Sequence, residues 1–202
     1  MQKAFQPIDV AWILIAPTRR IIDWIKDDDQ PVPRGDKLRA WSFWLFVGEL
    51  SAFVFLTLFV QGPPSPMSAW LYLPLLFWAW SRINEVCYAF YQDALTRTKR
   101  SNLERWERIR MAMRSFFALC FNFALFFYFL PIPDLFNRGL DGFWEAFYFS
   151  GVTLATLGYG DISPAHRISQ ALALWEVLAG ILIVAVAIAR YAGEEPDPPN
   201  AA

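Results

Sequence analysis

The sequence is poor in charge, in cysteine and in histidine, and each shortage excludes a class of protein. Charged residues make up 18% of the 202 residues, against about 25% in an ordinary soluble domain. The formal net charge of −1 excludes broad electrostatic binding to nucleic acid. The only two cysteines, Cys87 and Cys120, lie in apolar runs, which argues against a secreted disulfide framework.

Sequence patterns of catalysis are missing as well. The single histidine and the two cysteines form no metal-binding cluster, and we find no phosphate-binding loop, nucleophile elbow or dinucleotide fingerprint. We therefore expect neither an enzyme nor a bound cofactor.

Apolar and aromatic residues are what the chain has in excess. Hydrophobic residues make up 56% of it, and there are 19 Phe and 10 Trp, more than a small soluble core can bury. A hydrocarbon layer about 30 Å thick needs roughly 20 apolar residues in a helix. Four stretches qualify, over residues 40–60, 67–91, 111–130 and 168–191. Together they predict an all-α membrane protein with four transmembrane helices.

A fifth apolar stretch, residues 143–157, is too short to span. It follows Asp141 and Gly142 and precedes the glycine-rich residues 158–160. Backbone without regular structure is tolerated at membrane depth only where protein or water surrounds it. We interpret this stretch as a re-entrant helix followed by a loop.

The basic residues are distributed very unevenly between the two sides of these spans. Sixteen of the 18 Lys and Arg lie before the first span, in or after the second span, or at the end of the fourth; only Arg138 and Arg167 lie on the other side. The positive-inside rule then places both termini and the linker 92–110 in the cytoplasm of a plasma-membrane protein. The re-entrant segment enters from outside.

The segment from Thr156 to Asp161 carries the functional signal. Its sequence is Thr-Leu-Gly-Tyr-Gly-Asp, and glycines at alternate positions permit left-handed backbone angles that other residues resist. Angles of alternating hand point successive carbonyls to the same side. Several copies around an axis would form stacked rings of oxygens that replace the water shell of a cation.

This segment resembles the selectivity filter of tetrameric potassium channels. The match is to the threonine–x–glycine–tyrosine–glycine–aspartate signature, with Leu157 where valine is commonest. The resemblance covers residues 111–191 and implies an outer helix, a pore helix, a filter and an inner helix. It also implies a homotetramer that binds K⁺ at Thr156, Leu157, Gly158 and Tyr159, with Gly160 and Asp161 completing the outer mouth.

Three positions around the filter depart from the family pattern. Tyr148 and Phe149 replace two tryptophans that surround the filter tyrosine in many relatives, which keeps the aromatic packing but removes an indole donor to Asp161. Val152 stands where some bacterial relatives carry a glutamate. We expect altered filter inactivation, which currents of the natural chain and of Val152→Glu would compare.

The inner helix contains Gly180, nineteen residues after Asp161. A glycine there is either a gating hinge, because it lowers the cost of bending a helix, or a site of close helix packing. Val184 and Ile188 lie below it and are candidates for the lining of a hydrophobic inner pore.

Three charged residues within the spans are functional candidates, because a charge in lipid is costly. Glu49 and Arg82 lie at similar depths in the first two spans, so they could pair, with Arg82 reaching the cytoplasmic face as the alternative. Glu176 either hydrogen-bonds behind the pore helix or faces the cavity. His166, just outside the filter, is either a group whose protonation tunes conduction or an ordinary surface residue.

The chain thus divides into five expected segments. Residues 1–39 form a cytoplasmic amphipathic segment, either on the membrane surface or docked on the protein itself. A transmembrane hairpin (40–91) and a basic linker (92–110) precede the pore module (111–191). The tail (192–202) is too short for a soluble ligand-binding domain.

These observations favour a potassium-selective channel whose partners are its own copies, the lipid bilayer and K⁺. Three alternatives stay open. They are a weakly selective cation channel, a potassium transporter subunit, and a non-conducting membrane scaffold that keeps a relict filter.

Overall fold

The structure, a computed structural model, describes residues 33–62, 69–95, 105–187 and 189. Within these residues the chain forms five helices and no strand. The helices are α3 (Pro33–Phe59), α4 (Ala69–Leu95), α5 (Arg105–Phe129), α6 (Phe143–Leu154) and α7 (Arg167–Val186). The predicted all-α class is confirmed.

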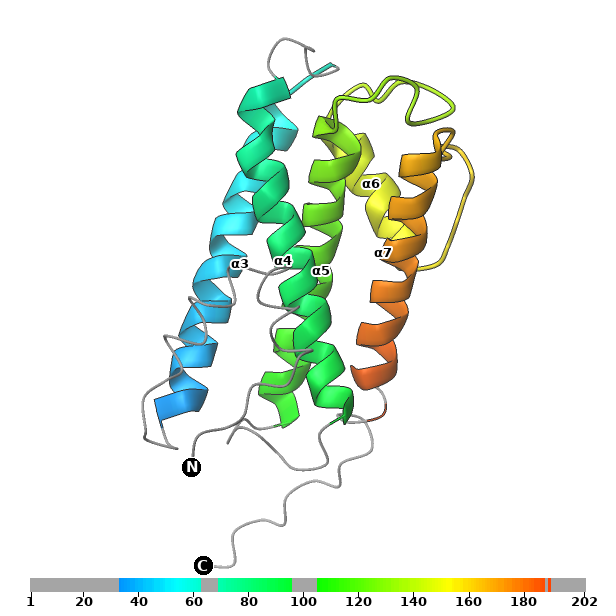
Figure 1. Ribbon diagram of the computed structural model, residues 1–202. Coiled ribbons are helices and arrows are strands. Elements are labelled where there is room, and N and C mark those ends of the chain that lie inside the picture. Colours follow the sequence, from blue (N-terminus) through cyan, green and yellow to red (C-terminus); the bar gives the residue numbers. More distant parts are fainter. Residues whose placement is uncertain (1–32, 63–68, 96–104, 188, 190–202) are drawn as a thin grey trace, which may run out of the picture.

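Four long helices lie side by side, and the short helix α6 fits into one half of the bundle beside α5 and α7 (Figure 1). The start of α3, the end of α4, the start of α5 and the end of α7 all lie at the lower end of the bundle in this view. Successive long helices therefore run in opposite directions, as the predicted hairpin and pore module require.

Among the described residues, three helices are long and apolar enough to cross a membrane, namely Arg39–Phe59, Trp106–Phe129 and Arg167–Val186. The predicted second span, α4, is 27 residues long, as α3 is, but it is not one of the three helices that are apolar enough. Its second half contains Ser81, Arg82, Asn84 and Glu85, which reduce its apolar character. These residues are buried or half-buried against the other helices.

The helix ends differ from the predicted span ends by several residues. α3 begins at Pro33 rather than at residue 40, because proline suits the first turn of a helix. α5 likewise begins six residues earlier than the predicted span, at Arg105. An apolar run marks only the part of a helix that lies in lipid, and the helix continues beyond it into polar residues.

Helix α5 is the centre of the bundle. In its apolar stretch 72% of the residues are buried inside the chain, against 28% for the apolar stretch of α7 and 6% for that of α3. Leu119, Phe123 and Phe127 are fully or almost fully buried. α3 therefore lies at the periphery and presents large apolar side chains outward, among them Val54, Phe55, Leu58 and Phe59.

The outer turn of the hairpin is joined to the beginning of α6. The backbone N–H of Gly62 donates to the carbonyl of Asp141 at 2.8 Å, and Gln61 forms an isolated bridge with Gly142. The Tyr128 hydroxyl of α5 also donates to the carbonyl of Gly62. The hairpin and the pore module thus meet at the outer end through hydrogen bonds.

Parts of the predicted segments lie outside the described residues. These parts are residues 1–32 of the amphipathic segment, 63–68 of the hairpin, 96–104 of the linker, 188 and 190–191 of the pore module, and the whole tail 192–202.

Candidate functional site

Helix α6 is held in place by aromatic packing. Its first residue, Phe143, is fully buried, and its ring centroid lies 5.8 Å from that of Tyr128 in α5. From α3, the Phe53 ring lies 4.4 Å from the Phe147 ring. The 12 residues of α6 extend roughly 18 Å, which is too short to cross a membrane. α6 therefore ends at Leu154 inside the bundle, as predicted for a re-entrant helix.

The loop after α6 has a backbone of alternating hand. The φ angles are +57° at Thr156, +58° at Gly158 and +80° at Gly160. Both glycines thus adopt the left-handed conformation expected from the sequence, and the alternation turns successive carbonyls to one side. The loop rises from the inner end of α6 to the outer end of α7 (Figure 1).

The left-handed angle at Thr156 was not predicted. No sequence signal points to it, because a β-branched residue disfavours positive φ. Such a conformation costs on the order of 1–2 kcal/mol. Strain of this kind collects at functional sites, so it singles out the start of this loop.

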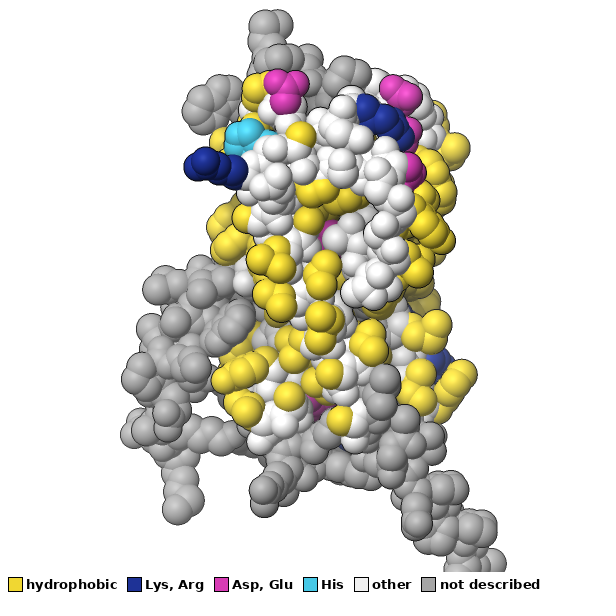
Figure 2. All heavy atoms as spheres, turned by 90° about the vertical axis from the view of Figure 1, so that its right-hand side faces the viewer, with side chains coloured by type: hydrophobic (Ala, Val, Ile, Leu, Met, Phe, Trp, Pro, Cys, Tyr) yellow, Lys and Arg dark blue, Asp and Glu magenta, His cyan; other side chains and the backbone are white. Residues whose placement is uncertain are grey.

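The loop lies uncovered on one face of the chain. All residues from 155 to 161 are exposed, and the side chains of Leu157 and Tyr159 are 58% and 66% exposed. Figure 2 shows this face, on which hydrophobic side chains gather along the middle of the molecule. Lipid cannot satisfy the polar backbone of such a loop, so protein or water must surround it in a membrane.

The outer end of the loop returns to the neighbourhood of α6. Burial and the nearby Asp161 carboxylate raise the pKa of the Tyr148 hydroxyl. A phenol hydroxyl of α6 therefore lies near Asp161, at a position where many potassium channels have an indole.

The other two predicted filter supports contribute through packing and through the backbone. The Phe149 ring is buried in the core, with its centroid 4.9 Å from those of Phe127 and Phe136. The carbonyl of Val152 accepts a hydrogen bond of 2.9 Å from the N–H of Leu157. This bond fixes how the chain leaves α6 and enters the loop.

Glu176 joins α7 to the back of α6. Its side chain is completely buried and is hydrogen-bonded to Ser150 of α6, whose Oγ also lies 2.8 Å from the carbonyl oxygen of Cys120 in α5. Of the two readings, the structure shows the hydrogen bond behind the pore helix. The cavity-facing reading is wrong, since no part of the side chain is exposed.

The hydrogen count at Ser150 bears on the protonation of Glu176. Ser150 has one hydroxyl hydrogen, and the carbonyl of Cys120 can only accept. Both contacts are satisfied together when the Glu176 carboxyl carries the proton and donates to Ser150. Its other oxygen, Oε2, is buried with no partner among the described residues, a position that suits a neutral acid better than an unpaired charge.

Gly180 lies where α7 meets the end of α6. A Cβ atom at this position would come within 2.7 Å of the carbonyl oxygen of Leu154. Close packing is therefore what this glycine makes possible in the structure, in which α7 continues through it without a break. Its role as a gating hinge stays a prediction.

Each end of α7 carries a residue that the sequence singles out. At the outer end, the Nδ1 atom of His166 accepts a hydrogen bond of 3.1 Å from the N–H of Ile168, so His166 caps the helix. Its effect on conduction stays a prediction. At the inner end, Val184 is exposed on the same side as other apolar residues of α7, and Ile188 lies outside the described residues.

An ion pair holds the start of α6 at the outer end. The Arg138 guanidinium donates two hydrogen bonds of 2.9 Å to the carboxylate of Glu145, which also accepts from the backbone N–H of Asp141. Hydrogen bonding with Arg138 lowers the pKa of Glu145 from its usual range.

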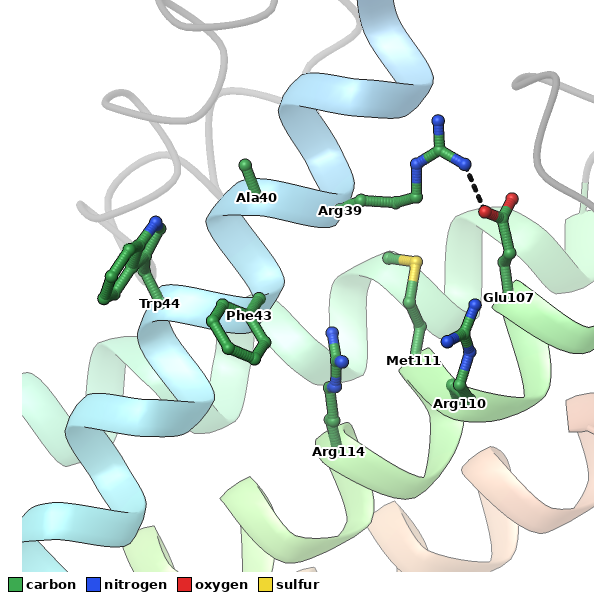
Figure 3. Close-up of a pocket in the computed structure, with 8 residues that line it drawn as sticks. All are labelled: Arg39, Ala40, Phe43, Trp44, Glu107, Arg110, Met111 and Arg114. Carbon is green, nitrogen blue, oxygen red and sulfur yellow. Dashed lines mark hydrogen bonds and ion pairs between the residues drawn. The ribbon is translucent and has the colours of Figure 1, made fainter.

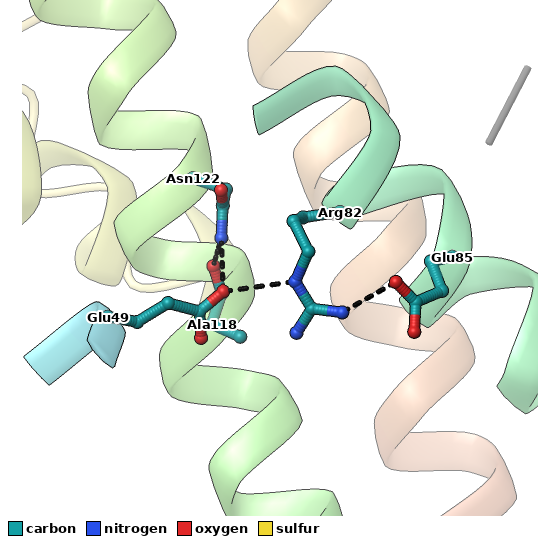
Figure 4. Close-up of polar contacts among 5 residues, drawn as sticks. All are labelled: Glu49, Arg82, Glu85, Ala118 and Asn122. Carbon is teal, nitrogen blue, oxygen red and sulfur yellow. Dashed lines mark hydrogen bonds and ion pairs between the residues drawn. The ribbon is translucent and has the colours of Figure 1, made fainter. Parts of the chain in front are cut away.

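The intramembrane charges of the hairpin meet as predicted (Figure 4). Arg82 Nε donates to Glu49 Oε1 at 3.2 Å, and its other arm contacts Glu85 at 2.7 Å. Asn122 of α5 donates to the same Glu49 oxygen at 3.1 Å. Arg82 is only 6% exposed, so the alternative in which it reaches the cytoplasmic face is wrong. The part of Asn122 was not predicted, because a single amide in an apolar run gives no sign of its partner.

Comparison with protein families identifies the segment that contains these features. The sequence model of a family described as "Ion channel" matches residues 115–193. Residues 115–193, the channel segment, are therefore similar to this family. The channel segment contains most of α5 and all of α6, the loop and α7, and it leaves the α3–α4 hairpin outside. No curated protein and no solved structure gave a match to the chain.

Proposed function

We propose that four copies of this chain form a potassium-selective channel in the plasma membrane, through which K⁺ moves passively down its electrochemical gradient. The observation that carries the proposal is the alternating backbone at Thr156, Gly158 and Gly160 in a loop that starts from a re-entrant helix. No other described segment combines alternating positive φ with exposure of the backbone.

The carbonyl oxygens from Thr156 to Tyr159 would replace the hydration shell of K⁺. The Thr156 hydroxyl would add a ligand at the inner end. Gly160 and Asp161 would form the outer mouth, where the carboxylate attracts cations close to the Tyr148 hydroxyl.

Assembly of copies follows from the geometry of one loop. A single loop offers oxygens to one side of an ion, so a complete coordination shell needs loops from several subunits around an axis. The face that carries the loop also carries exposed apolar side chains of α7 (Figure 2). They are Leu174, Leu178, Ile181 and Val184. The hairpin packs on α5 and on the flank of α7, which leaves this face open for the other subunits.

We also propose that α4 crosses the membrane with the other three long helices. It is as long as α3, and its charged residues Arg82 and Glu85 pair with each other inside the bundle. Arg39 lies in the first turns of α3, and Arg110 and Arg114 lie in the first half of α5, toward the inner end. Arg138 precedes α6 and Arg167 begins α7, at the outer end. The predicted placement of both termini in the cytoplasm rests on the uneven count of basic residues in the sequence.

Flux of K⁺ into liposomes that contain the purified chain tests the proposal. We expect flux from the natural chain and a loss of about tenfold or more in Gly158→Ala, because alanine at a φ of +58° is strained. Gly48→Ala is the matched control, since its Cβ would meet nothing within 4 Å. Equal flux in the natural chain and Gly158→Ala would refute the filter mechanism.

The same preparation separates the alternatives. A reversal potential that follows K⁺ in mixed K⁺ and Na⁺ supports a selective channel, and one that follows both ions indicates a weakly selective cation channel. A natural chain without flux indicates a scaffold, or a transporter subunit that needs a partner.

A further inference from the structure

A pocket lies between α3 and α5 at the inner end of the bundle, away from the filter (Figure 3). Its volume is about 350 Å³. The lining residues used below are Arg39, Phe43 and Trp44 from α3 and Glu107, Arg110 and Arg114 from α5.

The pocket has an excess of positive charge. Its one carboxylate, Glu107, is paired with Arg39 at the rim. Within the described residues Arg110 and Arg114 have no ion pair, and both lie over aromatic rings. Arg110 is 5.9 Å from the Trp106 ring centroid, and Arg114 is 5.5 Å from that of Phe43. Two guanidinium groups are therefore available to an anion.

The position of the pocket matches the boundary between membrane and water. Arg39 and Trp106 begin the apolar spans of α3 and α5, and Arg114 lies eight residues after Trp106, roughly 12 Å along the helix axis. Trp44, at the same level of α3, is 68% exposed. Tryptophan is enriched at the depth of lipid headgroups, and a long arginine can extend its charge to that depth.

A lipid phosphate fits this combination better than a free anion does. Guanidinium groups bind phosphate oxygens through pairs of parallel hydrogen bonds. The exposed rings of Phe43 and Trp44 offer an apolar wall to the first carbons of acyl chains, for which inorganic phosphate has no counterpart. The net charge favours an anionic headgroup over a zwitterionic one, whose own cation the arginines repel.

We propose that this pocket binds the headgroup phosphate of an anionic phospholipid of the inner leaflet, held by Arg110 and Arg114. The lipid lies between α3 and α5 and so joins the hairpin to the channel segment at the inner end. The site is separate from the filter and does not depend on the ion that the channel selects.

Native mass spectrometry of the purified full chain in a neutral detergent tests the proposal. Phosphatidylglycerol and phosphatidylcholine with identical acyl chains are titrated in parallel. We expect tighter binding of phosphatidylglycerol to the natural chain and a loss of about tenfold or more in the double variant R110Q/R114Q, since each arginine near a membrane surface is worth roughly fivefold.

The controls are chosen to isolate the pocket. R167Q removes one exposed arginine at the opposite end of the bundle and should leave lipid binding unchanged. Millimolar inorganic phosphate should not displace the lipid. The comparison of the two lipids on the natural chain tests the proposal even where a variant does not fold.

Three results would overturn the assignment. They are equal binding of the two lipids, equal loss in R167Q and R110Q/R114Q, and displacement of the lipid by inorganic phosphate.

Discussion

At the scale of single residues, Glu176 decides how the inner helix is joined to the pore helix. It is buried against Ser150, whose single hydrogen is also within reach of the Cys120 carbonyl. A protonated carboxylic acid at Glu176 satisfies this arrangement. A glutamine side chain can replace that acid, because its amide also donates a hydrogen bond.

We therefore predict that Glu176→Gln keeps the thermal stability of the natural chain, whereas Glu176→Ala loses about 1–3 kcal/mol through unsatisfied buried groups. Thermal unfolding of the purified proteins in detergent measures both. Equal destabilisation by the two substitutions would show that Glu176 is ionised or that its contact with Ser150 is not formed.

Gly180 gives a second prediction at this scale. The Cβ of Gly180→Ala would meet the Leu154 carbonyl at 2.7 Å, and backbone cannot withdraw as a flexible side chain can. Overpacking of this kind costs about 1–3 kcal/mol and displaces the end of α6, so both the melting temperature and K⁺ flux should fall.

Gly151→Ala serves as its control, because that Cβ would meet nothing within 4 Å. A Gly180→Ala variant with normal stability and changed open time would instead favour the hinge.

At the scale of elements, the hairpin is bound to the channel segment by a buried charge network. Glu49 of α3, Arg82 of α4 and Asn122 of α5 meet at one oxygen. Removing one member of a buried pair leaves a charge without compensation, whereas neutralising both members is far less costly.

We predict that Arg82→Gln destabilises the protein by about 3–5 kcal/mol and that Glu49→Gln added to it recovers part of the loss. A double-mutant cycle on unfolding measures the coupling, and Arg167→Gln is the matched control at an exposed site. Additive effects of the two substitutions would contradict the pairing.

The start of α6 carries a prediction about pH. Because the pKa of Glu145 is lowered by hydrogen bonding with Arg138, the bond contributes stability above the usual pKa of glutamate, about 4.3. This contribution is lost as the pH falls through the lower pKa of the folded state.

Unfolding temperatures at neutral pH and near pH 3 test this relation. Glu145→Gln should unfold at a lower temperature than the natural chain at neutral pH, and the difference should shrink in acid. A difference that is the same at both pH values would contradict the role of the ionised pair.

The sequence predicted the elements well because lipid imposes a simple rule on helix length and composition. It predicted the re-entrant helix from the shortness of 143–157 and the Glu49–Arg82 pair from equal depth. It did not reveal that Asn122 also binds Glu49, or which of its two alternatives Glu176 adopts. Those features depend on which side chains of different helices meet, and no local pattern records that.

At the scale of the whole molecule, the uncovered face of α7 and the loop predicts assembly. Native mass spectrometry of the detergent-purified chain should give four times the subunit mass of 23.3 kDa. A monomer or a dimer under conditions that preserve K⁺ flux would contradict a four-fold channel.

The burial of α5 has a consequence for how the surrounding bilayer reaches the pore. The helices α3 and α4 cover α5. Of the apolar stretch of α3 only 6% is buried inside the chain, against 72% for α5. Lipid tails therefore contact α3 more than α5. Changes in bilayer thickness or tension would act first on the α3–α4 hairpin. They would reach α6 through the Gln61–Gly142 bridge and through Phe53. Truncation of outward-facing residues of α3 such as Leu58 and Phe59 should consequently cost the fold less than truncation of the buried Phe123 of α5.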